Sequence, residues 1–416
     1  MPSYEQRLLA LYDVANYTRN LLHTPLIVYS GQKDAQMQAA LVMQESFESH
    51  SATMPHLIGE GMGHACNNSK HPQPTLRIEG YDVSDELPVC ADHPGVADEL
   101  SRRLSVMVAD GRVTTPAADS LQTLTLRYNN TKRLTALALA EHWEDSRLDA
   151  TFTPLAATVT TNPNILAFSV KSGQAPTAVI NGVPIDIPAA VAATGTACFA
   201  RLDATMSFAW VSAPPACGTA VAEMRKVPGQ QGPMDDVFMA PFLVVTPDST
   251  GSTAVDEWVA FELNHLLERW AGLFRGNPRV KKASEVTSED KAGYNLVLWG
   301  TSESNSLIAD FFATPGLPFQ WGKDASTATI GTRSFSAAAV VPQLVYPSPF
   351  GAGKCVLLNS GMTFREGHDG TNSMQNAKLP DWAVIDIASA VPNETVPGVV
   401  LAAGFCDEAW QPLPPH

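Results

Sequence analysis

The spacing of apolar residues changes twice along the 416-residue chain, and this change constrains the fold more than any other feature. At both ends, unbroken apolar runs alternate with amphipathic stretches, which is typical of buried strands joined by helices. In the middle, apolar and polar residues alternate between Asn-Pro, Asn-Gly and Ser-Gly turns, as they do in half-buried strands. The sequence therefore predicts a mixed α/β and β protein.

These patterns divide the chain into three expected domains, in agreement with its length. Residues 1–112 have the pattern of an α/β segment. Residues 113–222 have the pattern of a β-sandwich. Residues 223–416 return to α/β alternation, and their apolar strands predict a mainly parallel sheet covered on both faces.

Four elements within these domains are predicted from local signals. Helical spacing favours helices over residues 4–22 and 255–274. Alternation predicts a strand over residues 123–128, and the Asn-Gly pair within residues 179–185 predicts a tight hairpin, because Asn and Gly accept positive φ.

The charge balance limits the partners that the chain can have. A net charge of −15 and a pI near 5.0 exclude nucleic acid and anionic membrane surfaces as expected partners. No apolar run has the length needed to span a bilayer. The first twenty residues lack the apolar centre of a signal peptide, so the sequence leaves the compartment unknown, with a cytoplasmic location expected if no parent protein is exported.

The six cysteines occur without any CxxC pair, which excludes zinc-ribbon and thioredoxin motifs. Cys66–Cys90 and Cys198–Cys217 would close short loops, so one or two disulfides are compatible with an oxidising compartment. Free buried thiols are equally compatible.

Asp34 and His64 form the most informative pair of residues. Asp34 follows an apolar strand within Ser-Gly-x-x-Asp, and His64 follows the next strand within Gly-x-Gly-His. In a hydrolase sheet, an acid past one strand orients a histidine past the next toward the nucleophile. Taken alone, Asp34 is better explained as a helix cap and His64 as a loop residue. Their order and spacing favour a catalytic pair.

The stretches LIVYSGQKDAQMQAALVM and HLIGEGMGHA resemble the end of the peptidase-like α/β-hydrolase domain in bacterial proteins related to prolyl oligopeptidase. NLVLWGTSESN, VLLNSGMTFRE and KLPDWAVIDI are similar to the downstream region of that group. The resemblance implies that Asp34 is the triad acid, that His64 is the triad histidine, and that the parent protein is exported or periplasmic. It further implies that residues 1–112 are the end of an α/β-hydrolase domain.

The nucleophile is the main departure from this family. The Gly-x-Ser-x-Gly elbow lies well upstream of the acid in the family, and no such motif occurs in the 416 residues. We therefore expect the C-terminal portion of a longer protein, or a short form with a reduced sheet whose exposed edge pairs with another copy. Ser302, Ser304 and Ser360 follow buried strands and are weak alternatives, each better explained as a cap or turn residue. Ser30 lies near Asp34 in sequence, on the wrong side of the expected geometry.

A metal could instead activate water. The candidate ligands are two acidic clusters, Asp235 with Asp236 and Glu366 with Asp369, and calcium is the cation that oxygen-rich loops favour. The first cluster is better explained as a helix start and the second as a polar turn.

Three functions remain open. The first is a hydrolase acting on ester, lactone or peptide-like bonds with Asp34 and His64. The second is a non-catalytic binding or scaffold portion of a larger peptidase. The third is a calcium-assisted hydrolase such as a lactonase.

Overall fold

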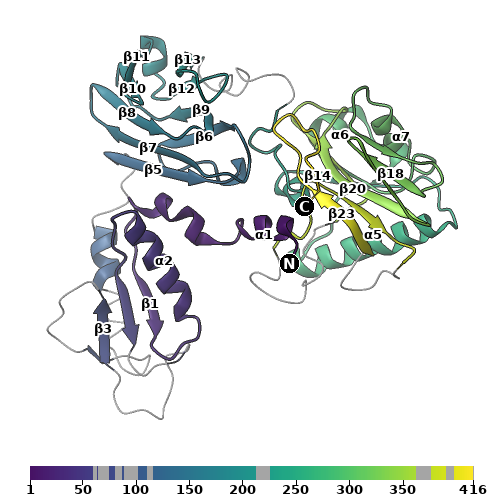
Figure 1. Ribbon diagram of the computed structural model, residues 1–416, viewed down its shortest axis with the longest axis horizontal. Helices are drawn as coiled ribbons and strands as arrows, with labels where there is room; N and C mark the ends of the chain where they lie inside the picture. The colour runs from purple at the N-terminus through teal and green to yellow at the C-terminus, as the bar shows by residue number, and fades with distance from the viewer. Residues whose placement is uncertain are drawn as a thin grey trace.

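The computed structural model describes residues 1–59, 63, 75–79, 87–88, 102–109, 116–211, 225–361, 376–389 and 398–415. The protein is mixed α/β, and its described strands form five sheets. Figure 1 shows these sheets in three groups, which follow one another along the chain.

The first group is a four-stranded sheet in the order β1-β2-β3-β4. β1 (Val28–Gly31) pairs in parallel with β2 (His56–Gly59), and α2 (Met37–Ser49) makes the crossover that a parallel pair requires. β3 (Thr75–Glu79) and β4 (Leu87–Pro88) continue the sheet in antiparallel fashion. Residues 102–109 are helical.

The single helix expected over residues 4–22 is wrong. The structure has α1 (Ser3–Leu9) and a separate 3-10 helix, η1 (Val14–Leu21). Asp13 separates them, because its extended backbone and its side chain, which accepts from the Ala15 N–H, begin a new helix.

The second group consists of two sheets that share one hydrophobic cluster. The five-stranded sheet has the order β11-β10-β8-β7-β5, and its strands are β5 (Ala118–Thr123), β7 (Ser146–Phe152), β8 (Ala156–Thr161), β10 (Thr177–Ile180) and β11 (Val183–Asp186). The four-stranded sheet has the order β13-β12-β9-β6, with β6 (Leu134–Leu139), β9 (Ile165–Val170), β12 (Ala197–Ala200) and β13 (Ala209–Val211). A short helix, α4 (Ala189–Ala192), lies between β11 and β12.

Two local predictions in this group have opposite outcomes. The β10–β11 hairpin is confirmed, with Asn181 and Gly182 at φ 50° and 84°. The strand expected over residues 123–128 is wrong, because β5 ends at Thr123 and the 3-10 helix η2 (Leu126–Tyr128) follows. Thr123 and Thr125 cause this, since their hydroxyls accept from the N–H groups of Thr125 and Arg127.

The third group is built on a seven-stranded sheet in the order β15-β14-β16-β21-β20-β22-β23. Its strands are β14 (Phe242–Thr246), β15 (Val280–Lys282), β16 (Asn295–Leu298), β20 (Val340–Pro347), β21 (Cys355–Leu358), β22 (Trp382–Asp386) and β23 (Val399–Gly404). The helices are η4 (Met234–Met239), α5 (Ala254–Phe274), η5 (Ala283–Glu285), α6 (Ser288–Gly293) and α7 (Ser306–Phe312). A small antiparallel sheet is inserted after α7 and consists of β17 (Phe319–Trp321), β18 (Thr327–Ile330) and β19 (Arg333–Ser336).

The seven-stranded sheet is parallel in one half only. β15, β14, β16 and β21 are parallel to one another, whereas β20, β22 and β23 each run antiparallel to the strands beside them. The mainly parallel sheet expected from the sequence is therefore wrong for this second half. Every residue of β22 and all but the last of β20 are buried, so their apolar runs look the same in sequence as those of parallel strands.

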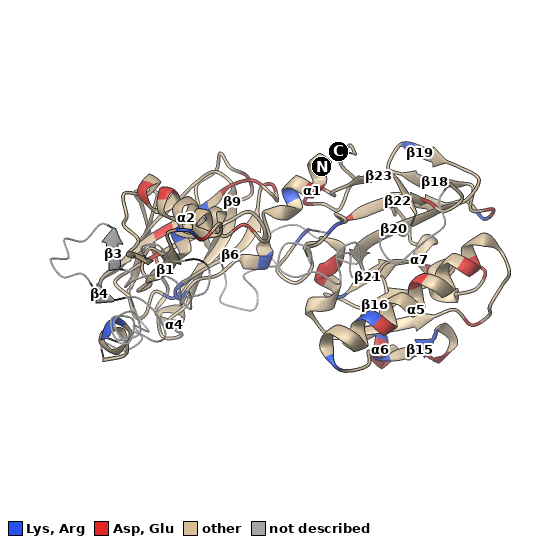
Figure 2. Cartoon of the chain, turned by 90° about the horizontal axis from the view of Figure 1, so that it is seen from below, with Lys and Arg blue, Asp and Glu red and all other residues tan. Residues whose placement is uncertain are grey.

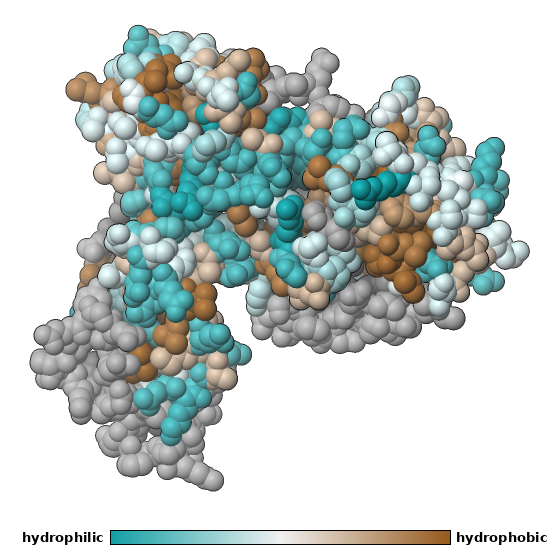
Figure 3. All heavy atoms as spheres, in the orientation of Figure 1, coloured by the Kyte–Doolittle hydropathy of each residue, from teal (hydrophilic) through white to brown (hydrophobic). Residues whose placement is uncertain are grey.

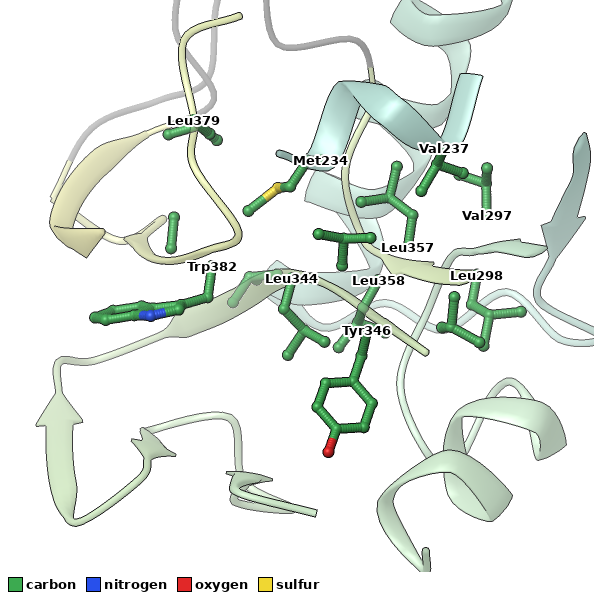
Figure 4. Packing of buried hydrophobic residues seen from close by; sticks show 14 of the residues in the cluster. Met234, Val237, Val297, Leu298, Leu344, Tyr346, Leu357, Leu358, Leu379 and Trp382 are labelled. Carbon is green, nitrogen blue, oxygen red and sulfur yellow. The ribbon is translucent and has the colours of Figure 1, made fainter. Parts of the chain in front are cut away.

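The core of this third group contains the fully buried indoles of Trp258, Trp299, Trp382 and Trp410. Figure 4 shows residues from neighbouring strands and η4, including Met234, Leu357 and Trp382, packing around one another. The buried thiols of Cys355 and Cys406 are free, whereas Cys198 in the second group is disulfide-bonded.

In Figure 2 the Lys and Arg positions of the described residues are scattered along the chain and interspersed with Asp and Glu. In Figure 3 a hydrophobic patch lies over β23, where Val399 and Leu401 are exposed. Within the described ranges, no helix is both long and apolar enough to cross a membrane.

Candidate functional site

Asp34 lies just beyond the carboxyl end of β1. Gly31, the last residue of β1, pairs with Gly59, the last residue of β2, so both strands end at the same edge. The partly buried Asp34 carboxylate accepts a hydrogen bond of 2.9 Å from the Gln36 N–H, and the backbone N–H of Asp34 donates to the Gly31 carbonyl. This turn delays α2, which begins at Met37.

His64 lies outside the described residues. In sequence it follows the described Gly63 and stands five residues after Gly59, the end of β2. Asp34 thus follows β1 at the edge where the neighbouring parallel strand β2 also ends, and His64 follows β2 in the sequence.

Ser30 and His56 form a buried pair that the sequence interpretation missed. The Ser30 hydroxyl lies 2.5 Å from Nε2 of His56, and the two residues are 7% and 0% exposed. They project from the neighbouring strands β1 and β2. Period-two alternation places Ser30 and Val28 on one face of β1, and Val28 is level with His56. Because neither side chain is open to solvent, the pair links the two strands.

The three alternative serines lie at the carboxyl edge of the seven-stranded sheet. Ser302 and Ser304 are in the loop between β16 and α7, and Ser360 follows β21. The buried Ser304 hydroxyl accepts a 3.0 Å hydrogen bond from the Thr301 N–H, and the Ser360 hydroxyl, also buried, donates to the Gly361 carbonyl at 3.3 Å. Ser302 is exposed.

Asn359 joins the two loops that carry these serines. Its side chain accepts from the Gly300 N–H and donates to the Gly300 carbonyl, both at 2.9 Å. Gly300 has a φ of 119°, and a Cβ there would lie 2.7 Å from the Ser304 hydroxyl oxygen. Sequence order conceals this link, because Asn359 and Gly300 are 59 residues apart.

The structure does not bring these serines to Asp34. Figures 1 and 2, which view the protein from directions 90° apart, show β1 at one end of the molecule and the seven-stranded sheet at the other, with β14 and β20 labelled in Figure 1 and β16 and β21 in Figure 2. The candidate acid and the candidate nucleophiles therefore belong to separate sites within one chain.

Comparisons with protein-family models, with curated proteins and with solved structures find no match.

A pocket of about 490 Å³ opens beside the carboxyl ends of β14 and β16. After β14 the chain continues to β15 on one side of the sheet, and after β16 its next strand in this sheet is β20 on the other side, so the neighbouring strands β14 and β16 form a topological switch point. Ligands bind open α/β sheets in the crevice at such points. The pocket is lined by the start of α5, by the loop after β16 that contains Ser304, and by the β17–β18 turn.

The first residues of α5 form one wall of this pocket. Thr253 and Asp256 make a capping box, in which the Asp256 carboxylate accepts from the Thr253 N–H at 3.0 Å and the Asp256 N–H donates to the Thr253 hydroxyl at 3.2 Å. Gly251 lies against that carboxylate, because a Cβ at this position would be 2.0 Å from Oδ2 of Asp256. The carboxylate therefore holds this wall in place.

The proposed metal ligands Asp235 and Asp236 lie at the start of η4, and both are buried. Asp236 is 3.0 Å from the Arg127 guanidinium and accepts from the Gln231 amide. Burial raises the pKa of Asp236 to about 7, against the opposing effect of Arg127. Glu366 and Asp369 lie outside the described residues. Among the residues that the structure describes, no group of three His, Cys, Asp or Glu side chains could hold a metal ion.

A buried hydrogen-bonded pair, His142 and Glu408, connects the second and third groups of elements. Nδ1 of His142 is 2.6 Å from the Glu408 carboxylate, and its Nε2 lies 3.4 Å from the Leu126 N–H, which can only donate. Burial lowers the pKa of His142, and Glu408 opposes this shift. His142 is therefore a neutral ring that donates to Glu408 and accepts from Leu126.

Lys226 and Asp381 form a second buried pair, both 0% exposed and 2.7 Å apart. Burial lowers the pKa of Lys226, but the combined effects of Asp381, Cys406 and Glu408 outweigh it, so the net shift is upward. Asp381 also accepts from the Cys406 N–H at 2.8 Å.

Proposed function

We propose that the chain is a hydrolase-related protein of the prolyl-oligopeptidase-like group that acts on ester, lactone or peptide-like bonds. The observation that carries this proposal is the parallel β1–β2 pair, with Asp34 just past β1 and the sequence Gly-x-Gly-His past β2. Such an edge lets a carboxylate orient an imidazole.

The proposal includes a domain arrangement of a partial α/β-hydrolase end (1–112), a β-sandwich (113–222) and an α/β domain (223–416). The common hydrophobic cluster of the two middle sheets supports a sandwich. The α2 crossover between parallel strands supports the hydrolase end.

In this proposal the nucleophile comes from a strand placed beside β1. β1 has a neighbour on one side only among the described strands, so its other edge can accept a further strand. That strand would belong to a longer parent chain or to a second copy. The alternative serines Ser302, Ser304 and Ser360 lie too far from Asp34 in both views to serve it within one chain.

Two variants test the acid and the base. We expect Asp34→Asn and His64→Ala each to lower kcat/KM for p-nitrophenyl butyrate and for an acyl-homoserine lactone by roughly two orders of magnitude or more, since a general base contributes on that scale. Glu45→Gln, an exposed position on α2, is the matched control and should retain wild-type rates.

Activity that neither variant changes would overturn the proposal. A wild-type chain with no turnover of either substrate would leave the second candidate, a non-catalytic binding portion of a larger peptidase. The switch-point pocket favours that candidate, because it lies away from Asp34. Activity lost with a chelator and restored by calcium would instead support the metal-assisted alternative.

The disulfide at Cys198 supports export of the parent protein, because disulfides persist in oxidising compartments.

A further inference from the structure

The switch-point pocket continues into a second pocket of about 240 Å³. Both pockets are lined by Thr301, Glu303, Lys323 and Ala325. Together they form a groove between the loop after β16 and the β17–β18 turn, which we call the switch-point groove. Its size suits a small molecule with several functional groups.

Glu303 and Lys323 offer charges of opposite sign to this groove. Both side chains are exposed, and neither forms an ion pair with any residue in the described part of the chain. The other two acids of the groove are already engaged. Asp256 closes the α5 capping box, and Asp324 accepts from the N–H and hydroxyl of Ser326 at 3.1 and 2.9 Å. The groove thus presents one available carboxylate and one available ammonium group.

Trp321 supplies a fixed aromatic wall to the smaller pocket. Its indole Nε1 donates a 3.0 Å hydrogen bond to the Val340 carbonyl, which holds the ring in one orientation. Small side chains leave room for a ligand in both pockets, with Ala309 and Ala325 lining the smaller pocket and Ala338 and Ala339 the larger one.

The charge of the lining selects the kind of ligand. Three carboxylates (Asp256, Glu303 and Asp324) face one ammonium group (Lys323), so a phosphate or another anion is repelled. A neutral ligand that carries both donors and acceptors can use Glu303 and Lys323 together.

We propose that the switch-point groove binds a neutral saccharide. A sugar ring has an apolar C–H face that can pack on the Trp321 indole, and hydroxyl groups that can donate to Glu303 and accept from Lys323. This inference does not depend on the proposed hydrolase function, because the groove contains neither Asp34 nor His64.

Isothermal titration of the full chain with maltotriose, cellotriose and chitotriose tests the proposal. We expect at least one of these sugars to bind, and Glu303→Gln and Lys323→Met each to weaken that binding by about tenfold, the effect of losing one charge-assisted hydrogen bond. Trp321→Phe should weaken it less, because a smaller aromatic face remains. Glu257→Gln, exposed on α5 outside the groove, and Lys33→Met, exposed beyond β1, are the matched controls and should bind as the wild type does.

The proposal is overturned if none of the three sugars binds, or if the Glu303 and Lys323 variants bind as tightly as the wild type. Equal or tighter binding of glucose 6-phosphate or of triglycine would also overturn it, since these would identify an anion or peptide site. Asp34→Asn should leave sugar binding unchanged, which keeps this result separate from the test of hydrolysis.

Discussion

At the scale of single residues, the third group should be sensitive to the loss of one partner of the buried Lys226–Asp381 pair. Both side chains are fully buried, and the Asp381 carboxylate also accepts a hydrogen bond from the Cys406 N–H. Lys226→Met leaves an uncompensated carboxylate, so we expect a loss of about 3–5 kcal/mol in the free energy of unfolding. Urea denaturation measures this loss.

The exposed pair Arg147–Asp145, at 44% and 39% side-chain exposure, provides the control. Arg147→Ala should cost no more than about 1 kcal/mol. The double variant Lys226→Met with Asp381→Asn should recover part of the loss, because no charge is then left unpaired. Equal losses for Lys226→Met and Arg147→Ala would contradict the assigned role.

Single residues could be placed from the sequence only where neighbouring residues gave a signal. The position of Asp34 past a strand was predictable, because a run of apolar residues and a Ser-Gly turn precede it. Lys226 and Asp381 are 155 residues apart, and no spacing in the sequence indicates that they meet. Ser30 and His56 were missed because each looks like an ordinary strand residue.

At the scale of elements, α5 depends on its first turn. The Thr253 hydroxyl accepts from the Asp256 N–H at 3.2 Å and thereby satisfies a backbone group at the start of the helix. Thr253→Ala should lower the free energy of unfolding by about 0.5–2 kcal/mol. Ser252→Ala, one residue earlier and outside the cap, should change it by less than about 0.5 kcal/mol. Similar values for the two variants in thermal unfolding would rule out this role for the cap.

Elements whose signal lies in adjacent residues were predicted correctly from the sequence, whereas the direction of the strands was not. The Asn181-Gly182 hairpin and the helix at 255–274 agree with the structure, because turn chemistry and helical spacing reside in adjacent residues. The antiparallel direction of β20 and β22 depends on the strands with which they pair. This pairing leaves no pattern in the residues of β20 or β22 themselves.

At the scale of the whole molecule, His142 and Glu408 join the middle sheets to the third group. The folded state keeps His142 neutral, and its pKa lies below the unfolded value of 6.5. Below about pH 6.5 the unfolded chain binds a proton that the folded chain does not, so stability is complete above this pH and is lost as the pH falls.

We therefore expect the free energy of unfolding to fall more steeply between about pH 7.5 and pH 5.5 for the wild type than for His142→Gln. Asp236, whose pKa is raised to about 7, acts with the opposite sign in both proteins, so the difference between the two curves isolates His142. Parallel curves in urea titrations would show that the ring does not titrate as described.

The buried thiols of the third group also make it possible to measure how fast the structure around them unfolds locally. Burial raises the pKa of Cys355 to about 12 and that of Cys406 well above its usual value, so both remain protonated and covered at neutral pH. A thiol reagent can then react only when β21 or the segment after β23 opens. Equal labelling rates at the two cysteines would indicate that the seven-stranded sheet opens as one unit, and unequal rates would reveal whether the central strand β21 or the segment after the edge strand β23 is uncovered first.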